Sequence, residues 1–265
     1  MSQKQTIIFS NSYSPRTGHN FASEALKVFT DHEVLAHARS ETRLSNFLKG
    51  YKELYNSIHF KSDRDFFDTI ILNDIRSNII KHSESNYILI KNTSFEGVKH
   101  IPEVFPDDIH ILLLRDPIDT FNSLFKAMNL NKMGHKYWIK KIGKVLGVYP
   151  YYFCRKVSMQ IIKDLPDFSK FYVVKYEDLV KQNITVLEAL KKKFNTPKSI
   201  EQIIEELSSI KVINSSFFEE TGAKGIWESK EITKGFNPIN RKKNSFLIRT
   251  GIALGAKELK SKLGY

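Results

Sequence analysis

The stretch that most constrains the fold of this chain lies near its N-terminus. Residues 6–10, TIIFS, are β-branched and aromatic, as in a buried strand, and an apolar helical pattern begins at Phe21. Between them lies the loop 13–20, YSPRTGHN. A loop that opens a helix aims backbone N–H groups at one point, at the positive end of the helix dipole. Arg16 adds a planar fork of donors and Gly18 permits close backbone approach, so this junction predicts an anion site.

Two other interpretations of this loop have to be weighed. A Walker A loop would need Gly-Lys-Ser or Gly-Lys-Thr, and neither follows Gly18. An ordinary strand-to-helix turn with a solvated Arg16 is the simpler alternative, and the loop by itself does not decide against it.

The rest of the chain alternates short apolar runs with helical patterns. The runs at 87–90, 111–114 and 171–174 are typical of strands buried on both faces. Such alternation predicts an α/β fold, with a central, mostly parallel sheet and helices on both faces, in a single domain, 1–265. The expected helices are 41–58, 63–82 with Asp63 as N-cap, 137–164 with a kink or break at Pro150, 184–194, 199–210 and 245–263, and 214–244 is expected to be a long loop.

Charge and composition limit the partners and the location. The chain has 265 residues and a net charge of +12, which attracts polyanions such as nucleic acid, anionic lipid or a phosphate-rich small molecule. No spacing matches a nucleic-acid module, so we expect no specific nucleic acid. The charge also suits an acidic acceptor or peripheral contact with an anionic membrane surface. The sequence has no long apolar run and no leader, and its single cysteine, Cys154, forms no internal disulfide, so we expect a cytoplasmic protein.

A second strand-to-helix junction lies at 114–123, LRDPIDTFNS. Asp116 suits the N-cap and Pro117 the first helical position. Arg115 then stands at the carboxyl end of a buried strand, where open α/β sheets bind ligands. The acids at this helix start would repel an anion, so Arg115 and Ser123 are expected to hold it from the side. Alternatively, Arg115 pairs with the neighbouring aspartates as a structural contact.

These stretches together resemble the sulfotransferase family. Residues 15–21, PRTGHNF, are similar to its phosphosulfate loop, Pro-Lys/Arg-Ser-Gly-Thr-Thr-Trp/Phe, and 114–123 to its Arg-Asx-Pro-x-Asp-x-x-x-Ser element. Residues 172–179 resemble its strand that ends in Tyr-Glu-Asp-Leu, and 240–243, NRKK, its Arg-Lys-Gly segment. Residues 214–217, NSSF, weakly resemble its Thr-Ser-Phe segment. Order and rough spacing agree over nearly the whole chain.

The resemblance implies a P-loop-like sulfotransferase architecture and a donor site. The donor is 3′-phosphoadenosine-5′-phosphosulfate (PAPS), the product is PAP, and no metal is required. Arg16 would be the catalytic residue that stabilises charge on the leaving group, since arginine holds its proton at any working pH. The implied donor-binding residues are Arg16, Thr17, Gly18, His19, Asn20, Phe21, Arg115, Ser123, Tyr176, Arg241 and Lys242.

The base that activates the acceptor is assigned from the same resemblance. One branch of the family places a histidine near the position of Thr93, which cannot act as a base at neutral pH. The carbohydrate-acting branch places a glutamate in the loop after the first helix, and His37 lies 37 − 18 = 19 residues past Gly18, about where that glutamate falls. Histidine titrates near neutrality, so we expect His37 first and Glu41 second as catalytic base.

The acceptor itself is not readable from the sequence, and neither is the oligomeric state. The segments 41–82 and 132–164 are expected to form helical walls on the acceptor side, and 214–244 a closing loop. Their aromatic and basic residues suit a small molecule or a glycan, including a lipid-linked one, with a hydroxyl or amine as the group that accepts sulfate. Two other functions remain open: a nucleotide kinase-like P-loop relative, and a non-catalytic basic module that binds polyanions.

Overall fold

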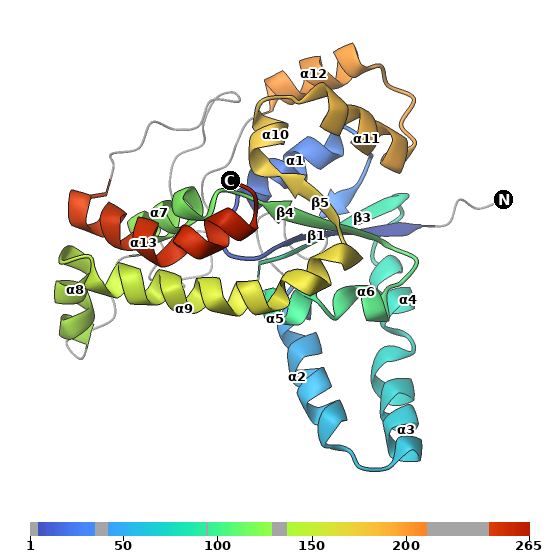
Figure 1. The fold of residues 1–265 in the computed structure, drawn as a ribbon. Helices are drawn as coiled ribbons and strands as arrows, with labels where there is room; N and C mark the ends of the chain where they lie inside the picture. The colour runs from blue at the N-terminus through green and yellow to red at the C-terminus, as the bar shows by residue number, and fades with distance from the viewer. Residues whose placement is uncertain (1–4, 35–41, 94, 129–136, 211–243) are drawn as a thin grey trace.

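The computed structural model describes residues 5–34, 42–93, 95–128, 137–210 and 244–265. Within these ranges five strands form one parallel sheet in the order β2-β3-β1-β4-β5 (Figure 1). The predicted α/β class and its parallel sheet are therefore confirmed. The strands are β1 (Thr6–Ser12), β2 (Glu33–Val34), β3 (Tyr87–Asn92), β4 (Ile109–Leu114) and β5 (Tyr172–Lys175).

Helices cover both faces of the sheet, because successive side chains of each buried strand point to opposite sides. In β1, Ile8 joins one core cluster and Ile7 and Phe9 join the other. The layer on the side of Ile8 contains α1 (His19–Lys27), α10 (Tyr176–Val180), α11 (Ile184–Phe194) and α12 (Ile200–Ser209). The opposite layer contains α2 (Leu44–Ser57), α5 (Phe95–Val98), α6 (Ile101–Val104), α7 (Pro117–Ala127), α9 (Val148–Asp164) and α13 (Phe246–Lys262).

The remaining helices are α3 (Lys61–Leu72) and α4 (Ile75–Ile80), which follow α2, α8 (Trp138–Val145), which precedes α9, and the 3₁₀ helix η3 (Leu165–Lys170). Both α4 and η3 pack on the core cluster of Ile7 and Phe9, to which η3 contributes Phe168. No helix in the described ranges is both long enough and apolar enough to cross a membrane.

Two sequence predictions about helix ends are wrong. The segment 63–82 forms two helices, and the first begins after Phe60, with Asp63 inside its first turn. The break expected at Pro150 lies instead at Gly147, whose φ of 78° is left-handed. Pro150 falls in the first turn of α9, where no intrahelical partner for its nitrogen is needed.

Other helix starts follow the local sequence. Asp116 caps α7 as predicted, and its Oδ1 accepts from the N–H of Ile118 at 2.8 Å. Ser199 forms a full capping box with Gln202 at the start of α12, and Ser245 caps α13. The expected loop 214–244 lies outside the described residues except for Asn244.

Candidate active site

The two predicted arginines lie at the carboxyl edge of the sheet, after the ends of two adjacent strands, β1 and β4. The chain leaves β1 toward β2 on one side of the sheet, and it leaves β4 toward β5 on the other. The switch point between β1 and β4 is where an open α/β sheet forms its binding crevice. Ser12 pairs with Leu113 in this register, so the loop of Arg16 and the junction of Arg115 start at the same level.

The helix that follows β1 has an N-terminus suited to an anion. Gly18 is its N-cap, in a left-handed conformation with φ 102°, and within the described structure no side chain caps it. The first turn of α1 contains no acidic residue. The positive end of the dipole is therefore not neutralised by the helix itself, in contrast to α7, whose start holds Asp116 and Asp119.

Direct contacts join the two arginines. A terminal nitrogen of Arg115, Nη1, donates to the backbone oxygen of Arg16 at 3.3 Å. The Nε of Arg16 donates to the hydroxyl of Ser123 on α7 at 3.4 Å. The structure thus brings Arg16, Arg115 and Ser123 together, as the sequence motifs predicted.

Tyr176, at the start of α10, completes this cluster. The guanidinium of Arg115 stands 4.6 Å from the centre of the Tyr176 ring, a cation–π contact. A Cβ on Gly18 would lie 2.5 Å from atoms of the same ring. Glycine is therefore required where the loop meets the ring. The motif tyrosine is the link between the loop after β1 and the arginine after β4.

Sequence reasoning missed the residue that positions Arg115. The hydroxyl of Tyr13, 4% exposed, donates to the backbone oxygen of Arg115 at 2.6 Å and lies 3.1 Å from the Thr120 hydroxyl. Burial raises the pKa of Tyr13, so it remains a neutral donor. The Nε of Arg115 is buried and has no hydrogen-bond partner in the described structure. A cationic donor of this kind fits an oxyanion ligand, whose oxygens would satisfy it.

A second network, also missed, occupies the acids beside this site. Asp116 pairs with Lys260 of α13 at 2.6 Å, and its backbone N–H donates to Glu177 at 3.0 Å. The hydroxyl of Tyr265 donates to the other oxygen of Glu177 at 3.0 Å. Asp116 thus has its own cation, whereas the charge of Arg115 acts on Asp119, where it opposes the rise in pKa that burial causes. The alternative in which Arg115 pairs with the neighbouring aspartates is therefore narrowed to Asp119.

Some predicted donor-site side chains are turned into the protein. Thr17 is fully buried and donates to the backbone oxygen of Ser14. Phe21, 3% exposed, packs edge-on against Tyr176 with ring centres 5.6 Å apart, in the core. The structure thus places Phe21 in the helix interface rather than on an open face where a base could stack.

His19 is buried as well, against the end of the sheet. Its Nδ1 lies 3.5 Å from the Ser10 hydroxyl, and its Nε2 is buried with no partner in the described structure. Burial, together with the charge of Lys91, lowers the pKa of His19 to about 3. The imidazole is therefore neutral at working pH. Asn20, the next residue, is half-buried at the helix start.

Four predicted site residues lie outside the described residues: His37, Glu41, Arg241 and Lys242. The structure therefore leaves their assignments as predictions. Within the described ranges no group of three or more His, Cys, Asp or Glu is placed to hold a metal ion.

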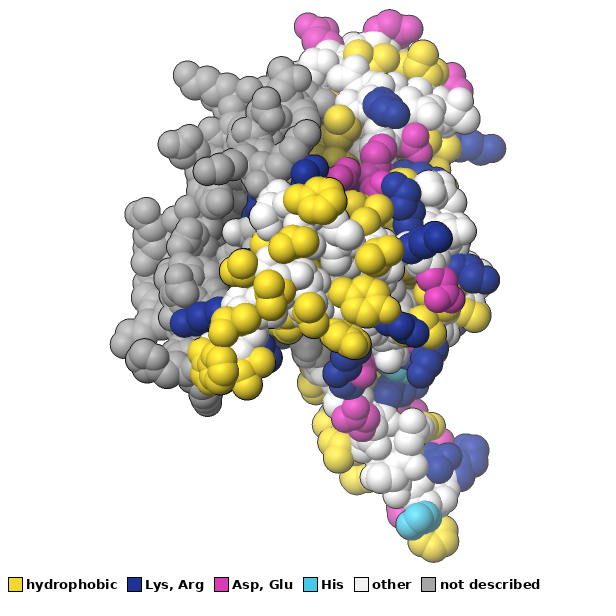
Figure 2. All heavy atoms as spheres, turned by 60° about the vertical axis from the view of Figure 1, so that its left-hand side comes forward, with side chains coloured by type: hydrophobic (Ala, Val, Ile, Leu, Met, Phe, Trp, Pro, Cys, Tyr) yellow, Lys and Arg dark blue, Asp and Glu magenta, His cyan; other side chains and the backbone are white. Residues whose placement is uncertain are grey.

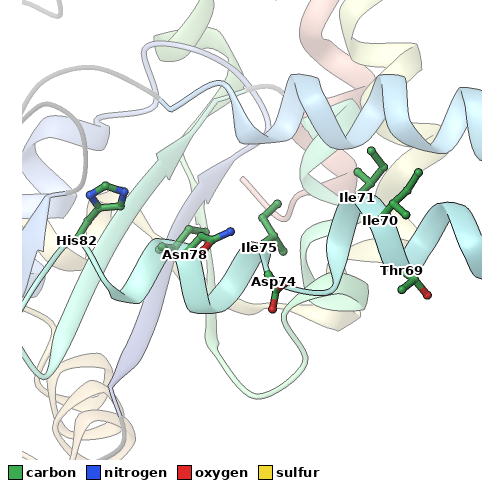
Figure 3. A pocket seen from close by; sticks show the side chains of 8 residues that line it. Thr69, Ile70, Ile71, Asp74, Ile75, Asn78 and His82 are labelled. Atoms are coloured by element: carbon green, nitrogen blue, oxygen red, sulfur yellow. The ribbon is translucent and has the colours of Figure 1, made fainter.

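A groove elsewhere on the molecule is unrelated to this site. It lies along α3 and α4, lined by residues that include Ile71, Asp74, Asn78 and His82 (Figure 3). Arg76 of α4 donates to the backbone oxygen of Gln5, just before β1. The groove therefore lies toward the amino edge of the sheet, and the arginines at the carboxyl edge do not line it.

The fold and the site together define the class. A parallel α/β sheet ends in a cationic cluster beside an acid-free helix start, an arrangement that takes oxyanions. A comparison with protein families matches residues 14–199 to the sulfotransferase family, and the chain belongs to that family. The match includes Arg16, Arg115 and Tyr176.

The chain was also compared with solved structures and with curated proteins. Among solved structures, the sulfotransferase domain from the curacin biosynthetic pathway aligns over 99% of both chains, with 14% identity and a TM-score of 0.41. Identity at this level gives no information on individual residues. No curated protein matches the sequence.

Proposed function

We propose that this chain transfers the sulfuryl group of PAPS to a hydroxyl or amine of an acceptor and releases PAP. The observation that carries the proposal is the contact of Arg115 with the backbone of Arg16, 3.3 Å, at the switch point of the sheet. PAPS carries a sulfate and two phosphates. A ligand with charge at both ends needs cations that lie within one site, and Arg16 and Arg115 are two such cations.

The geometry suggests a division of work between the arginines. Arg16 lies in the loop that opens α1, so it is proposed to stabilise the charge that develops on the leaving phosphate. It acts through charge alone, because its guanidinium does not give up a proton. Arg115 and Ser123 are proposed to hold the 3′-phosphate. The backbone of residues 17–20 would face the 5′-phosphosulfate, and Tyr176 would border the adenine.

The proposed base follows the edge strand. β2 ends at Val34, parallel to β3, so the chain leaves the sheet at the edge that holds the two arginines. His37 is three residues beyond and Glu41 seven, within covalent reach of that edge. We propose His37 as the acceptor base, with Glu41 as the second candidate.

Arg241 and Lys242 are close in sequence to Asn244, which contacts the candidate active site. Asn244 donates from its amide to the backbone oxygen and side-chain oxygen of Asn122, both at 3.0 Å. Asn122 precedes Ser123, and Arg241 and Lys242 precede Asn244 by three and two residues. This connection supports a role for both in closing over the 3′-phosphate.

The proposal also covers the acceptor, the domain and the location. A small molecule or a glycan is proposed as acceptor, bound between segments 41–82 and 132–164, in one domain over 1–265. No metal is assigned a role. The cytoplasm is proposed as location, in keeping with the single cysteine.

Binding of PAP to the full chain tests the donor site. Calorimetry should give saturable binding to the wild type and a loss of about 100-fold in affinity for Arg115→Ala, in proportion to a lost charge-assisted contact. Arg155→Ala is the matched control, because Arg155 is exposed on α9 and contacts Tyr151. ATP turnover with magnesium, in the absence of any PAP affinity, would instead favour the kinase-like alternative.

Transfer of label from PAPS to a panel of phenols, sugars and lipid-linked glycans tests the reaction. His37→Ala should lower the rate strongly, and Glu41→Ala should do so if the second candidate is the base. Full rates in both variants would refute the base assignment while leaving the donor site intact.

A further inference from the structure

The helix α8 exposes the face that a water-soluble protein usually buries. Five of its large apolar side chains, at the i, i+1, i+4, i+7 and i+8 spacing of one helical face, are 51–66% exposed. They are Trp138, Ile139, Ile142, Val145 and Leu146.

The polar side of α8 makes the attachment to the protein. Lys144 donates to the backbone oxygens of Phe125 at 2.8 Å and Met128 at 2.9 Å, at the end of α7. Partial burial lowers the pKa of Lys144. A lysine therefore fixes the helix to the protein, and its apolar side is left facing outward.

The apolar surface continues onto two neighbouring helix starts. A Cβ on Gly147 would lie 2.3 Å from the backbone oxygen of Leu247, so the starts of α9 and α13 touch. Figure 2, which brings this end of the molecule forward, shows hydrophobic side chains gathered over it. Apolar residues of α9 and α13 that are 48–71% exposed are Val148, Tyr152, Phe246 and Leu247 at the two starts and Leu254 farther along α13.

The helices that form this surface carry cations and, over the stretches that follow, no acid. Residues 137–163 and 244–257 contain no aspartate or glutamate. Besides Lys144, which is held by the end of α7, they contain several cations, namely Lys140, Lys141, Arg155, Lys156, Lys163, Arg249 and Lys257. Exposed apolar residues on α3, in contrast, are interspersed with three aspartates. Helix faces that combine exposed apolar side chains with cations and no acids are complementary to the headgroup region of an anionic bilayer.

We propose that the face formed by α8 and the starts of α9 and α13 docks on an anionic membrane surface. Its apolar side chains enter the boundary between headgroups and acyl chains, and its lysines and arginines contact the lipid phosphates. α13 begins two residues after Asn244, which bonds to Asn122 beside Ser123. Docking therefore brings the rim of the candidate active site to the lipid surface, and a lipid-linked acceptor fits that position. The lipid-linked acceptor rests on the proposed function, whereas the docking itself does not.

Vesicle co-sedimentation of the full chain tests the proposal, with phosphatidylcholine vesicles that contain or lack phosphatidylglycerol. The wild type should bind only the anionic vesicles, and added salt should weaken binding. The double variant Ile139→Glu, Ile142→Glu should bind them about tenfold or more weakly. The matched control is Phe66→Glu, Ile70→Glu on α3, where the exposures of 66% and 57% are similar and acids are nearby.

Each other outcome overturns the proposal. Absence of vesicle binding, equal binding to neutral vesicles, or an equal loss in the α3 control would each do so. Self-association without vesicles, abolished by the α8 substitutions, would assign the face to a second copy of the chain. Because vesicle binding is measured without PAPS, its failure is distinguishable from a failure of the proposed sulfate transfer.

Discussion

At the scale of single residues, the contact of Gly18 with Tyr176 joins the two halves of the site. A left-handed φ of 102° and a ring 2.5 Å from the missing Cβ both require glycine here. The same ring also contacts the guanidinium of Arg115. A change at Gly18 therefore reaches the arginine without touching it.

We predict that Gly18→Ala weakens PAP binding about tenfold or more, because the methyl group displaces Tyr176 and with it Arg115. The same change should lower the free energy of unfolding by about 1–3 kcal/mol through the strained φ. Calorimetry and urea unfolding measure the two effects. Gly50→Ala is the control: its Cβ meets nothing within 4 Å in α2, so stability should rise by up to about 1 kcal/mol with PAP affinity unchanged. Unchanged PAP affinity in Gly18→Ala would contradict this account of the site.

Buried histidines should make the protein sensitive to mild acid. Burial lowers the pKa of His32, 6% exposed, to about 3. The unfolded chain binds a proton at pH values below about 6.5, whereas the folded protein does not until about pH 3, so stability falls as the pH is lowered through this window. Between pH 7 and 5.5 the loss is about 1 kcal/mol for His32. Urea unfolding at both pH values should therefore show a smaller loss in His32→Gln, while the exposed His59→Gln keeps the wild-type difference.

The sequence predicted that Arg16 and Arg115 lie together but not what holds them. Arg16, Arg115 and Ser123 follow from motifs at two strand ends, and parallel strands bring such ends to one edge. The supports come from distant parts of the chain: Tyr265 reaches Glu177 across 88 positions, which no local pattern encodes. The role of Tyr13 had one weak indicator, an aromatic residue directly before the loop.

At the scale of elements, local chemistry predicted helix starts better than helix interruptions. Asp116 caps a helix through its own side chain, so its neighbours in sequence are enough to predict it. The break between α8 and α9 depends on tertiary packing instead. Gly147 stands against the backbone of Leu247 on α13, and only glycine permits both that approach and its left-handed φ. Pro150 was the stronger local indicator, and it was misleading.

At the contact between α9 and α13, close packing and helix propensity predict opposite changes in the free energy of unfolding. A Cβ on Gly251 of α13 would lie 2.1 Å from the backbone oxygen of Gly147. Propensity alone would make Gly251→Ala stabilising by about 1 kcal/mol. We expect the reverse, a loss of about 1–3 kcal/mol, because neither backbone can move without parting the helices. Chemical unfolding decides between the two signs, and a gain in stability would mean that the helices are not so closely packed.

At the scale of the whole molecule, the carboxyl edge and the amino edge of the sheet carry different kinds of contact. The carboxyl edge holds the cationic site. At the amino edge, Asp108 accepts from the N–H of Ile7 at 2.9 Å and from Arg76 at 2.8 Å, which ties β1, β4 and α4 together. The sequence predicted the parallel sheet but neither the strand order nor this contact, because an ion pair 32 residues apart has no local motif.

We therefore predict that stability and donor binding can be separated by a substitution at the amino edge. Asp108→Ala removes a fully buried carboxylate and leaves Arg76 and the Ile7 N–H without it, which should cost about 2–4 kcal/mol of unfolding free energy. Glu84→Gln, an exposed neighbour of the same edge, should cost almost nothing. PAP affinity, measured at a temperature where the variant is still folded, should match the wild type, because no contact of the arginine site passes through Asp108. If affinity fell together with stability, the two edges would be energetically coupled and the site would depend on the whole sheet rather than on its carboxyl ends.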